Sequence, residues 1–524
     1  MRDPVSVEIM KNLFASVADE MGVRLQRAAY SPNIKERCDF SCALFDADGR
    51  LIAQAEHIPV HLGAMPLSVQ ACLEAIAFSP GDVAIVNDPY HGGTHLPDVT
   101  LVSPVFVDTV EGPKLLGFVA NRAHHADVGG MSAGSMPLAE ELYQEGLIIP
   151  PLRLVHGGAI NQEVWRLLLA NVRTPEERAG DLHAQLAANR TGNERVLGLV
   201  ERYGADQIKR DMENLLHYSE HMTRRLLRDL PDGTYRYQDA LDDDGLTPEP
   251  VKICVSVTIS GDEALVDFSG TDAQRRGSIN AVYPITLSAT AYVFRCLLGL
   301  DIPGNSGCLV PIRVMAPEGT VVNARPPAAV AGGNVETAQR IVDVVLGALA
   351  QACPQRVPAA SQGTMNNVTV GGWDPQRRQP FAYYETLGGG MGARPAGDGA
   401  SAIHSHMTNT LNTPVEALEY AYPFRVTRYA VRPESGGQGR HRGGDGICRD
   451  LEMLSRAQVT ILSDRRTTGP YGLDGGKSGQ PGRNWLLRDG QLQALPGKCH
   501  LEVRPGDVVK IETPGGGGYG DSEG

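Results

Sequence analysis

Residues 87 to 98 read Asn-Asp-Pro-Tyr-His-Gly-Gly-Thr-His-Leu-Pro-Asp, and residues 121 to 130 read Asn-Arg-Ala-His-His-Ala-Asp-Val-Gly-Gly. These two segments hold four of the 14 histidines in the chain, together with three aspartates. Apolar runs at residues 99–107 and 115–120 lie between them and predict strands. Imidazole and carboxylate groups on loops at strand ends suit a metal ion, so the two segments predict a metal site. The residues concerned are His91, His95, His124, His125, Asp88, Asp98 and Asp127.

The first segment places His95 and Asp98 three residues apart, with Pro97 stiffening the loop between them. Two side chains at this spacing can converge on one ion, although a loop whose His and Asp bond backbone groups would show the same pattern. In the second segment, His124 and His125 follow a strand. Because side chains alternate along a strand, only one of these histidines can face a given site. The other can orient a ligand or contact the substrate.

A fourth ligand would come from elsewhere in the chain, and the candidates are Glu36 and Asp39. Glu36 could equally form a surface ion pair with Arg37. Two imidazoles with two carboxylates suit Zn²⁺, Mn²⁺ or Fe²⁺ and disfavour Ca²⁺. A catalytic ion of this kind would keep one position open for water or a substrate oxygen.

Other motifs carry less weight. His57 and His61 are four residues apart, but Pro59 lies between them, so they do not form a helical zinc pair. The histidines of residues 404–406 could line a site or serve no function. Cys308 is better explained by packing than as a nucleophile. No nucleotide-binding motif is present, because no Lys-Ser/Thr follows the glycines near the C-terminus.

The composition indicates an ordinary soluble protein with more than one core. The chain has 524 residues, of which 42% are hydrophobic and 21% charged. The net charge is −13 and no basic tract is present, so nucleic acid is not an expected partner. No apolar run is long enough for a membrane span, and no hydrophobic signal core is expected near the N-terminus. Nine scattered cysteines without a Cys-x-x-Cys pair indicate a cytoplasmic protein with reduced thiols.

Capping and periodicity patterns predict helices and antiparallel hairpins, and therefore an α+β (mixed α/β), multi-domain, loop-rich fold. A clean alternation predicts a hairpin with one wet face over residues 251–268. Further strands are expected at 40–45, 51–55 and 83–86. The expected helices cover residues 3–29, 66–77, 136–145, 161–172, 174–230 with a break at Gly204, 282–299, and 335–351 with Asn334 as its cap.

Three domains are expected from these patterns. An N-terminal metal-site domain with a helical extension would cover residues 1–230, and a central α/β domain residues 231–423. A C-terminal β-rich region would cover residues 424–524. It would end in a glycine-rich tail, residues 514–521, that we expect to be flexible.

Several motifs resemble the hydantoinase B/oxoprolinase family and span the chain from end to end. This family covers the B subunits of ATP-dependent N-methylhydantoinases, the matching half of 5-oxoprolinases, and the alpha subunits of acetone and acetophenone carboxylases. The motifs are Asp3-Pro-Val, Ser31-Pro-Asn-Ile-Lys-Glu-Arg37 with Asp39-Phe-Ser41, His57-Ile-Pro-Val-His-Leu-Gly-Ala-Met65, the two histidine segments, and Thr513-Pro-Gly-Gly-Gly-Gly-Tyr-Gly520.

The resemblance implies a division of labour between two subunits. A separate A-type subunit would bind ATP and activate the substrate carbonyl by phosphorylation, which agrees with the lack of a nucleotide motif here. The B-type chain would complete the reaction at a metal site. The carboxylase relatives imply a metal bound by Glu36, His95, Asp98 and His124, with the choice between His124 and His125 left open because spacings differ between branches of the family.

The leading hypothesis is the B-type chain of an ATP-dependent cyclic amidohydrolase in a hetero-oligomer, acting on a hydantoin or 5-oxoproline. His125, Asp39 or Asp127 could move protons. Arg122 could face a substrate carboxylate or phosphate, or could equally form a structural ion pair. One alternative is a carboxylase component that uses phosphorylated bicarbonate at the same ion. The other is a non-catalytic scaffold for the A-type partner.

Overall fold

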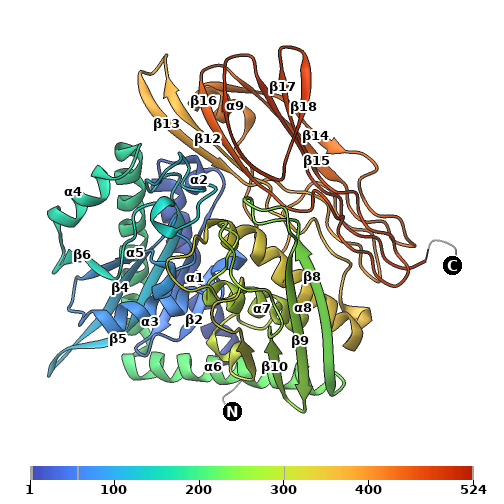
Figure 1. Cartoon of the computed structure of the whole chain (residues 1–524). Helices are drawn as coiled ribbons and strands as arrows, with labels where there is room; N and C mark the ends of the chain where they lie inside the picture. The colour runs from blue at the N-terminus through green and yellow to red at the C-terminus, as the bar shows by residue number, and fades with distance from the viewer. Residues whose placement is uncertain (1–3, 56–57, 300, 522–524) are drawn as a thin grey trace.

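The structure, a computed structural model, describes residues 4–55, 58–299 and 301–521. Within these ranges the chain forms nine α-helices and four β-sheets in a mixed, multi-domain fold (Figure 1). The predicted fold class is therefore confirmed. Over the same ranges, no helix is long and apolar enough to cross a membrane.

A seven-stranded antiparallel sheet within the first 160 residues carries both histidine segments. Its strand order is β2-β1-β5-β4-β3-β6-β7, so β5 and β4 lie at its centre. The strands are β1 (Phe40–Asp46), β2 (Leu51–Ala55), β3 (Val83–Val86), β4 (Asp98–Thr109), β5 (Gly112–His124), β6 (Leu152–His156) and β7 (Ala159–Ile160).

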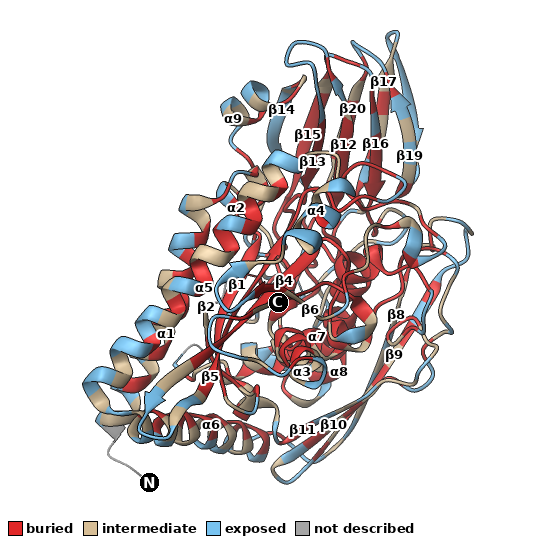
Figure 2. Ribbon diagram, turned by 90° about the vertical axis from the view of Figure 1, so that its left-hand side faces the viewer, coloured by how far each residue is buried: buried red, intermediate tan, exposed pale blue. Residues whose placement is uncertain are grey.

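The two faces of this sheet pack against different helices. Cys42 and Leu44 of β1 join the core formed with α1 and α5, whereas Ala43 and Phe45 join the core formed with α3. Burial on both faces explains why β1 reads as a continuous apolar strand. Figure 2 shows α1 and α5 along one side of the molecule, with their inner surfaces buried. The helices of this half are α1 (Pro4–Ala28), α2 (Pro32–Lys35), α3 (Met65–Ala75), α4 (Gln162–Ala170), α5 (Pro175–Tyr203) and α6 (Ala205–Arg228).

The local signals for these helices are confirmed at their ends. The Asn161 side chain accepts hydrogen bonds from the first backbone N–H groups of α4. Pro175 begins α5, and Gly204, at φ +81°, separates α5 from α6. The helix expected at residues 136–145 is wrong: that segment forms only a 3₁₀ turn, Leu142–Gln144. Its backbone bonds distant partners instead, as when Leu142 N–H donates to the Pro327 carbonyl oxygen.

A second sheet, of order β11-β10-β9-β8, packs on α8. The alternating apolar residues of β9 are buried and the polar ones between them are more exposed, so the predicted hairpin is confirmed. A π-helical turn, η5 (Gly333–Thr337), precedes α8 and contains Asn334. Asn334 therefore does not cap α8, and that prediction is wrong. The elements are β8 (Gly233–Leu241), β9 (Val251–Ser260), β10 (Glu263–Asp267), β11 (Ile312–Met315), α7 (Tyr283–Leu298) and α8 (Ala338–Ala352).

Two further sheets pack face to face around an apolar core in the C-terminal part, at the top of Figure 1. Their orders are β13-β12-β16-β19 and β14-β15-β20-β17-β18. The expected boundary at residue 423 falls between strands of the first of these sheets. The elements are β12 (Asn367–Asp374), β13 (Gln379–Glu385), α9 (Val415–Ala421), β14 (Phe424–Arg432), β15 (Gly446–Met453), β16 (Ala457–Leu462), β17 (Arg483–Arg488), β18 (Gln491–Leu495), β19 (Lys498–Val503) and β20 (Val508–Glu512).

The glycine-rich tail is part of this core region, so the expectation of a flexible end is wrong. Residues 513–520 are buried. The backbone of Gly516 donates to the Gly444 carbonyl oxygen and accepts from Gly437 N–H, at 2.9 and 2.8 Å. Glycine segments from three parts of the chain thus lie against one another, where side chains would keep the backbones apart.

Candidate metal centre

Asp39, His124 and Asp98 lie in a row across three neighbouring strands. β1 pairs with β5 so that Phe40 is opposite Ala123, which places Asp39 beside His124. The His124 N–H donates to the Asp39 carbonyl oxygen at 3.0 Å. β4 pairs with β5 so that Asp98 is opposite His124. Because side chains alternate, the three side chains share the sheet face that carries α3, away from α1 and α5.

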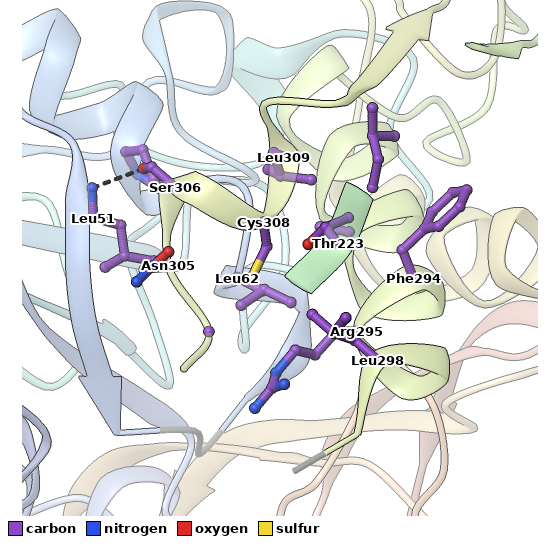
Figure 3. Close-up of a pocket in the computed structure, with 14 residues that line it drawn as sticks. Leu51, Leu62, Thr223, Phe294, Arg295, Leu298, Asn305, Ser306, Cys308 and Leu309 are labelled. Carbon is purple, nitrogen blue, oxygen red and sulfur yellow. Dashed lines mark hydrogen bonds between the residues drawn. The ribbon is translucent and has the colours of Figure 1, made fainter. Parts of the chain in front are cut away.

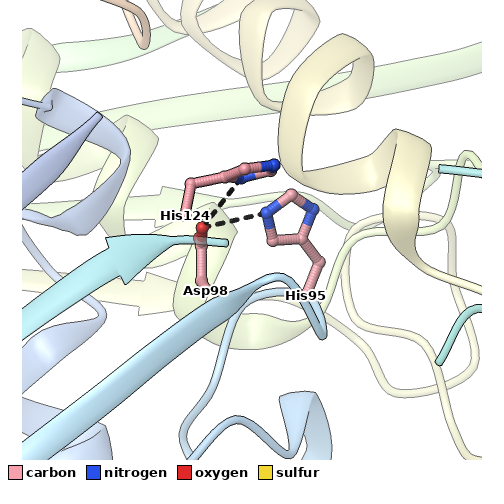
Figure 4. A group of neighbouring side chains, drawn as sticks. All are labelled: His95, Asp98 and His124. Carbon is pink, nitrogen blue, oxygen red and sulfur yellow. Dashed lines mark hydrogen bonds and ion pairs between the residues drawn. The ribbon is translucent and has the colours of Figure 1, made fainter. Parts of the chain in front are cut away.

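His95 reaches Asp98 from the turn that precedes β4. His95 Nε2 lies 3.0 Å from Asp98 Oδ1, and His124 Nδ1 lies 3.2 Å from the same oxygen (Figure 4). One ligand atom from each of the three residues lies within 4.8 Å of the others, and all three residues are buried. In the part of the chain that the structure describes, no other group of three His, Cys, Asp or Glu side chains has this geometry.

The surroundings of Asp98 favour its ionised form. Burial by itself raises the pKa of Asp98, but the charge of His95 and hydrogen bonds from His124 and His61 bring that pKa well below its usual value. Burial lowers the pKa of His124, although the hydrogen bond with Asp98 opposes this shift. An ionised carboxylate beside the His124 imidazole, whose pKa is lowered, is a donor pair suited to a cation.

Two buried ring nitrogens of this cluster, His95 Nδ1 and His124 Nε2, have no hydrogen-bond partner among the described residues. Buried polar atoms nearly always have one, so both nitrogens retain the capacity to bind a further group. Imidazole nitrogens with a carboxylate oxygen are donors that Zn²⁺, Mn²⁺ and Fe²⁺ accept. The residues present therefore fit a divalent transition-metal ion.

His61 is a further member of the cluster that the sequence did not identify. It lies in the 3₁₀ turn η1 (Pro59–His61), with Nε2 3.5 Å from Asp98 Oδ2 and Nδ1 2.9 Å from Ser41 Oγ. Thr94 Oγ1 donates to the same Asp98 oxygen at 2.6 Å. In the sequence, His61 was considered only with His57, and a helical zinc pair was rejected because of Pro59, whereas the partners of His61 come from other segments. His57 itself lies outside the described residues.

Asp39 and Glu36, the two candidates for a fourth ligand, lie in different surroundings. Asp39 lines the same small cavity as Asp98 and His124. Burial raises the pKa of Asp39, and the charges of His124 and Arg37 oppose that shift. Glu36 ends α2 and does not line this cavity. Burial raises the pKa of Glu36, with no contribution from the cluster.

The remaining predicted residues support neighbouring structure. His125 points away from the cluster towards α5, where its Nε2 lies 2.9 Å from Gln185 Oε1. Burial lowers the pKa of His125 to about 4. Asp127 forms a 2.9 Å ion pair with Arg173. Among the described residues, neither His125 nor Asp127 forms a hydrogen bond or ion pair with His95, Asp98 or His124.

Arg122 shares the sheet face of His124 but is bound to the sheet and to α3. Its Nε donates to Thr100 Oγ1 at 2.9 Å, and a terminal nitrogen donates to Ser68 Oγ at 2.6 Å. Burial lowers the pKa of Arg122 to about 10, which the nearby Asp98 charge opposes. The guanidinium is fully buried beneath the cluster.

Segments after residue 330 close the centre from the side opposite the sheet. Asn334 Nδ2, on the π-helical turn, lies 3.1 Å from His95 Nε2. The Tyr384 ring, at the end of β13, stacks on His124 with centroids 4.3 Å apart. The sequence pointed to neither contact. The cavity left between these groups measures about 20 Å³, which is enough for water or an ion.

Two other cavities lie near α7. One of about 210 Å³ shares Ile58 with the cavity at the cluster and is also lined by Tyr292. The other, shown in Figure 3, is apolar, measures about 30 Å³ and contains Cys308. Burial raises the pKa of Cys308, and its thiol donates to the Pro303 carbonyl oxygen at 3.3 Å. This thiol is therefore packed rather than activated.

Comparisons with known proteins identify the family to which the chain belongs. The family model described as hydantoinase B/oxoprolinase matches residues 3–522. The chain is 40% identical to 5-oxoprolinase 1 of Arabidopsis thaliana, over 99% of this chain and 42% of that protein. It is 33% identical to a protein of a Pseudomonas strain named as the B component of a D-/L-hydantoinase, over 99% of this chain and 90% of that protein.

A solved structure with the same fold is that of an ATP-dependent caprolactamase from Pseudomonas jessenii. The TM-score is 0.91 at 30% identity, over 99% of this chain and 92% of that one. The chain thus spans about two fifths of the plant 5-oxoprolinase and nearly the whole of the two bacterial proteins. A family model that matches almost every residue, together with these relatives, shows that the chain belongs to the hydantoinase B/oxoprolinase family.

Proposed function

We propose that the chain is the metal-bearing B-type component of an ATP-dependent enzyme that hydrolyses the ring amide of a hydantoin or of 5-oxoproline. The observation that carries the proposal is the buried group of His95, Asp98 and His124 with its two unpaired ring nitrogens. Relatives named as a 5-oxoprolinase, a hydantoinase component and an ATP-dependent caprolactamase support cyclic amides as the substrate class. The partner would be an A-type subunit that binds ATP.

We further propose that His95, Asp98 and His124 hold a divalent ion, Zn²⁺, Mn²⁺ or Fe²⁺, with Asp39 as the fourth donor. Such an ion would polarise a water molecule or a carbonyl oxygen. Asp98 supplies the central carboxylate, which His61 and Thr94 orient. His125, Asp127 and Arg122 keep the second histidine segment in place through their own partners.

The fourth ligand can be identified with a pair of matched substitutions. Asp39→Asn is expected to weaken metal binding by about 10- to 100-fold, because a neutral amide oxygen replaces a carboxylate facing the cavity. Glu36→Gln is expected to leave metal binding unchanged, because Glu36 does not line that cavity. Competition with a chelator, read by elemental analysis, gives both dissociation constants.

The reverse pattern, with metal lost only in Glu36→Gln, would assign the ligand to Glu36 as the carboxylase relatives imply. In that case Asp39 would be free to accept a proton beside the cluster. Retention of metal by Asp39→Asn with loss of turnover would identify that role.

The reaction is tested with the chain and its A-type partner purified together. We expect hydrolysis of a hydantoin or 5-oxoproline only when ATP is present. Turnover should stop when a chelator removes the ion and return when the metal is restored. Incorporation of labelled bicarbonate in place of hydrolysis would instead identify a carboxylase. A purified complex with ATP-dependent turnover but no metal on this chain would identify a scaffold.

A further inference from the structure

The metal centre proposed above is completed by a tyrosine from the C-terminal half of the molecule. Tyr384 is fully buried at the end of β13, and its ring stacks on His124 at 4.3 Å with 16° between the ring planes. Among the described residues, the His124 ring has one hydrogen bond, between Nδ1 and Asp98, because Nε2 has no partner there. A single bond leaves an imidazole free to tilt about it, so the stacked ring is what determines the plane of the His124 ring.

The Tyr384 ring is itself held from two directions. Its hydroxyl donates to Asn367 Oδ1 at 2.9 Å, and Asn367 Nδ2 donates to Glu336 Oε1 and to the Leu462 carbonyl oxygen, both at 2.8 Å. These bonds anchor the ring to β12 and to the π-helical turn. The hydroxyl bond is one of two contacts that hold this ring, which presents a flat surface to its neighbour.

Arg37 holds the same tyrosine from the N-terminal half. Its guanidinium lies 5.0 Å from the Tyr384 ring centroid and donates to the Tyr384 carbonyl oxygen at 2.8 Å and to Thr386 Oγ1 at 2.8 Å. Arg37 is fully buried and lies 3.8 Å from Asp39. One guanidinium thus connects the strand end that carries Asp39 with the strand end that carries Tyr384.

From these contacts we infer that Tyr384 is a positioning residue for the metal ligand His124, and that it acts through ring stacking rather than through its hydroxyl. Stacking fixes the direction in which the His124 lone pair points, so an ion meets a ligand already in place. The metal centre is then complete only when the C-terminal half is docked on the seven-stranded sheet. This inference depends on the proposed metal site.

The test compares three variants of the full chain by metal affinity and by the visible spectrum of the Co²⁺-substituted protein. Tyr384→Leu removes the ring and is expected to weaken metal binding by about tenfold or more and to change the Co²⁺ bands. Tyr384→Phe keeps the ring and is expected to stay within about twofold of wild type with an unchanged spectrum. Tyr383→Leu is the matched control, because Tyr383 is equally buried but packs on Tyr422 and Phe424 on the other face of β13.

The possible outcomes distinguish failure of the proposed metal site from failure of the positioning role of Tyr384. If wild type binds no metal, the proposed site itself fails. If wild type binds metal and Tyr384→Leu binds it as tightly, or if Tyr383→Leu loses metal to the same extent, only the positioning role is overturned. If Tyr384→Leu does not accumulate as folded protein, Tyr384→Met takes its place with the same expectation, because it fills more of the volume without a flat ring.

Discussion

His95→Ala is expected to remove both the bound metal and the turnover while the protein stays folded. In the proposed site His95 is one of three ligating side chains, and its loss should reduce metal affinity by more than the 10- to 100-fold that follows loss of a residue behind a ligand. Asp98 would still receive hydrogen bonds from Thr94 and His124, so no unpaired buried charge remains to unfold the sheet. Elemental analysis and ATP-dependent hydrolysis of 5-oxoproline measure the two losses.

The matched control for this substitution is His91→Ala in the same loop. The His91 side chain is 65% exposed and pairs only with Asp88, so its removal should change neither metal content nor turnover. Circular dichroism should show the same secondary structure for both variants. A His95→Ala protein that keeps one metal ion per chain and full activity would contradict the assigned ligand set.

The cluster of His95, Asp98 and His124 could be predicted because its members lie in neighbouring segments of the sequence. His95 and Asp98 belong to one turn, and the strands that carry Asp98 and His124 follow one another and pair directly. Alternation along β5 also required His124 and His125 to face opposite sides. Alternation alone does not determine which of the two histidines faces the site, because the answer depends on which face of the sheet α5 covers.

The contacts that sequence did not reveal all come from distant segments. His61 was rejected as part of a helical zinc pair because Pro59 separates it from His57, yet its partner Asp98 lies 37 positions further along the chain. The sequence pattern predicts that Asn334 caps a helix, but in the structure its side chain contacts His95 instead. Tyr384 lies in an ordinary strand pattern, which has no feature that would indicate a contact with His124. Local patterns predict elements, whereas the docking of one half of the molecule on the other determines which side chains meet.

The C-terminal tail is another segment whose surroundings could not be predicted from its local sequence. A run of four glycines at residues 515–518 carries no side chain that could signal burial, so composition alone suggested a mobile end. In the fold, the missing side chains are the reason for burial, because backbones can approach where no Cβ intervenes. The Gly390 N–H donates to the Pro514 carbonyl oxygen at 3.0 Å, and Gly517 N–H donates to the Ala360 carbonyl oxygen at 2.8 Å.

Gly516→Ala is therefore expected to destabilise the protein by about 3 kcal/mol or more, a cost at the upper end of overpacking a buried site. A Cβ at residue 516 would lie 2.7 Å from Gly392 N and closer still to the Met391 carbonyl oxygen, and neither backbone atom can rotate away. Gly198→Ala is the control, because an added Cβ in that exposed helical position meets nothing within 4 Å. It should be neutral or stabilising by up to about 1 kcal/mol. Thermal unfolding and limited proteolysis of the C-terminal strands measure both changes, and equal stability of the two variants would show that the glycine run is not close-packed.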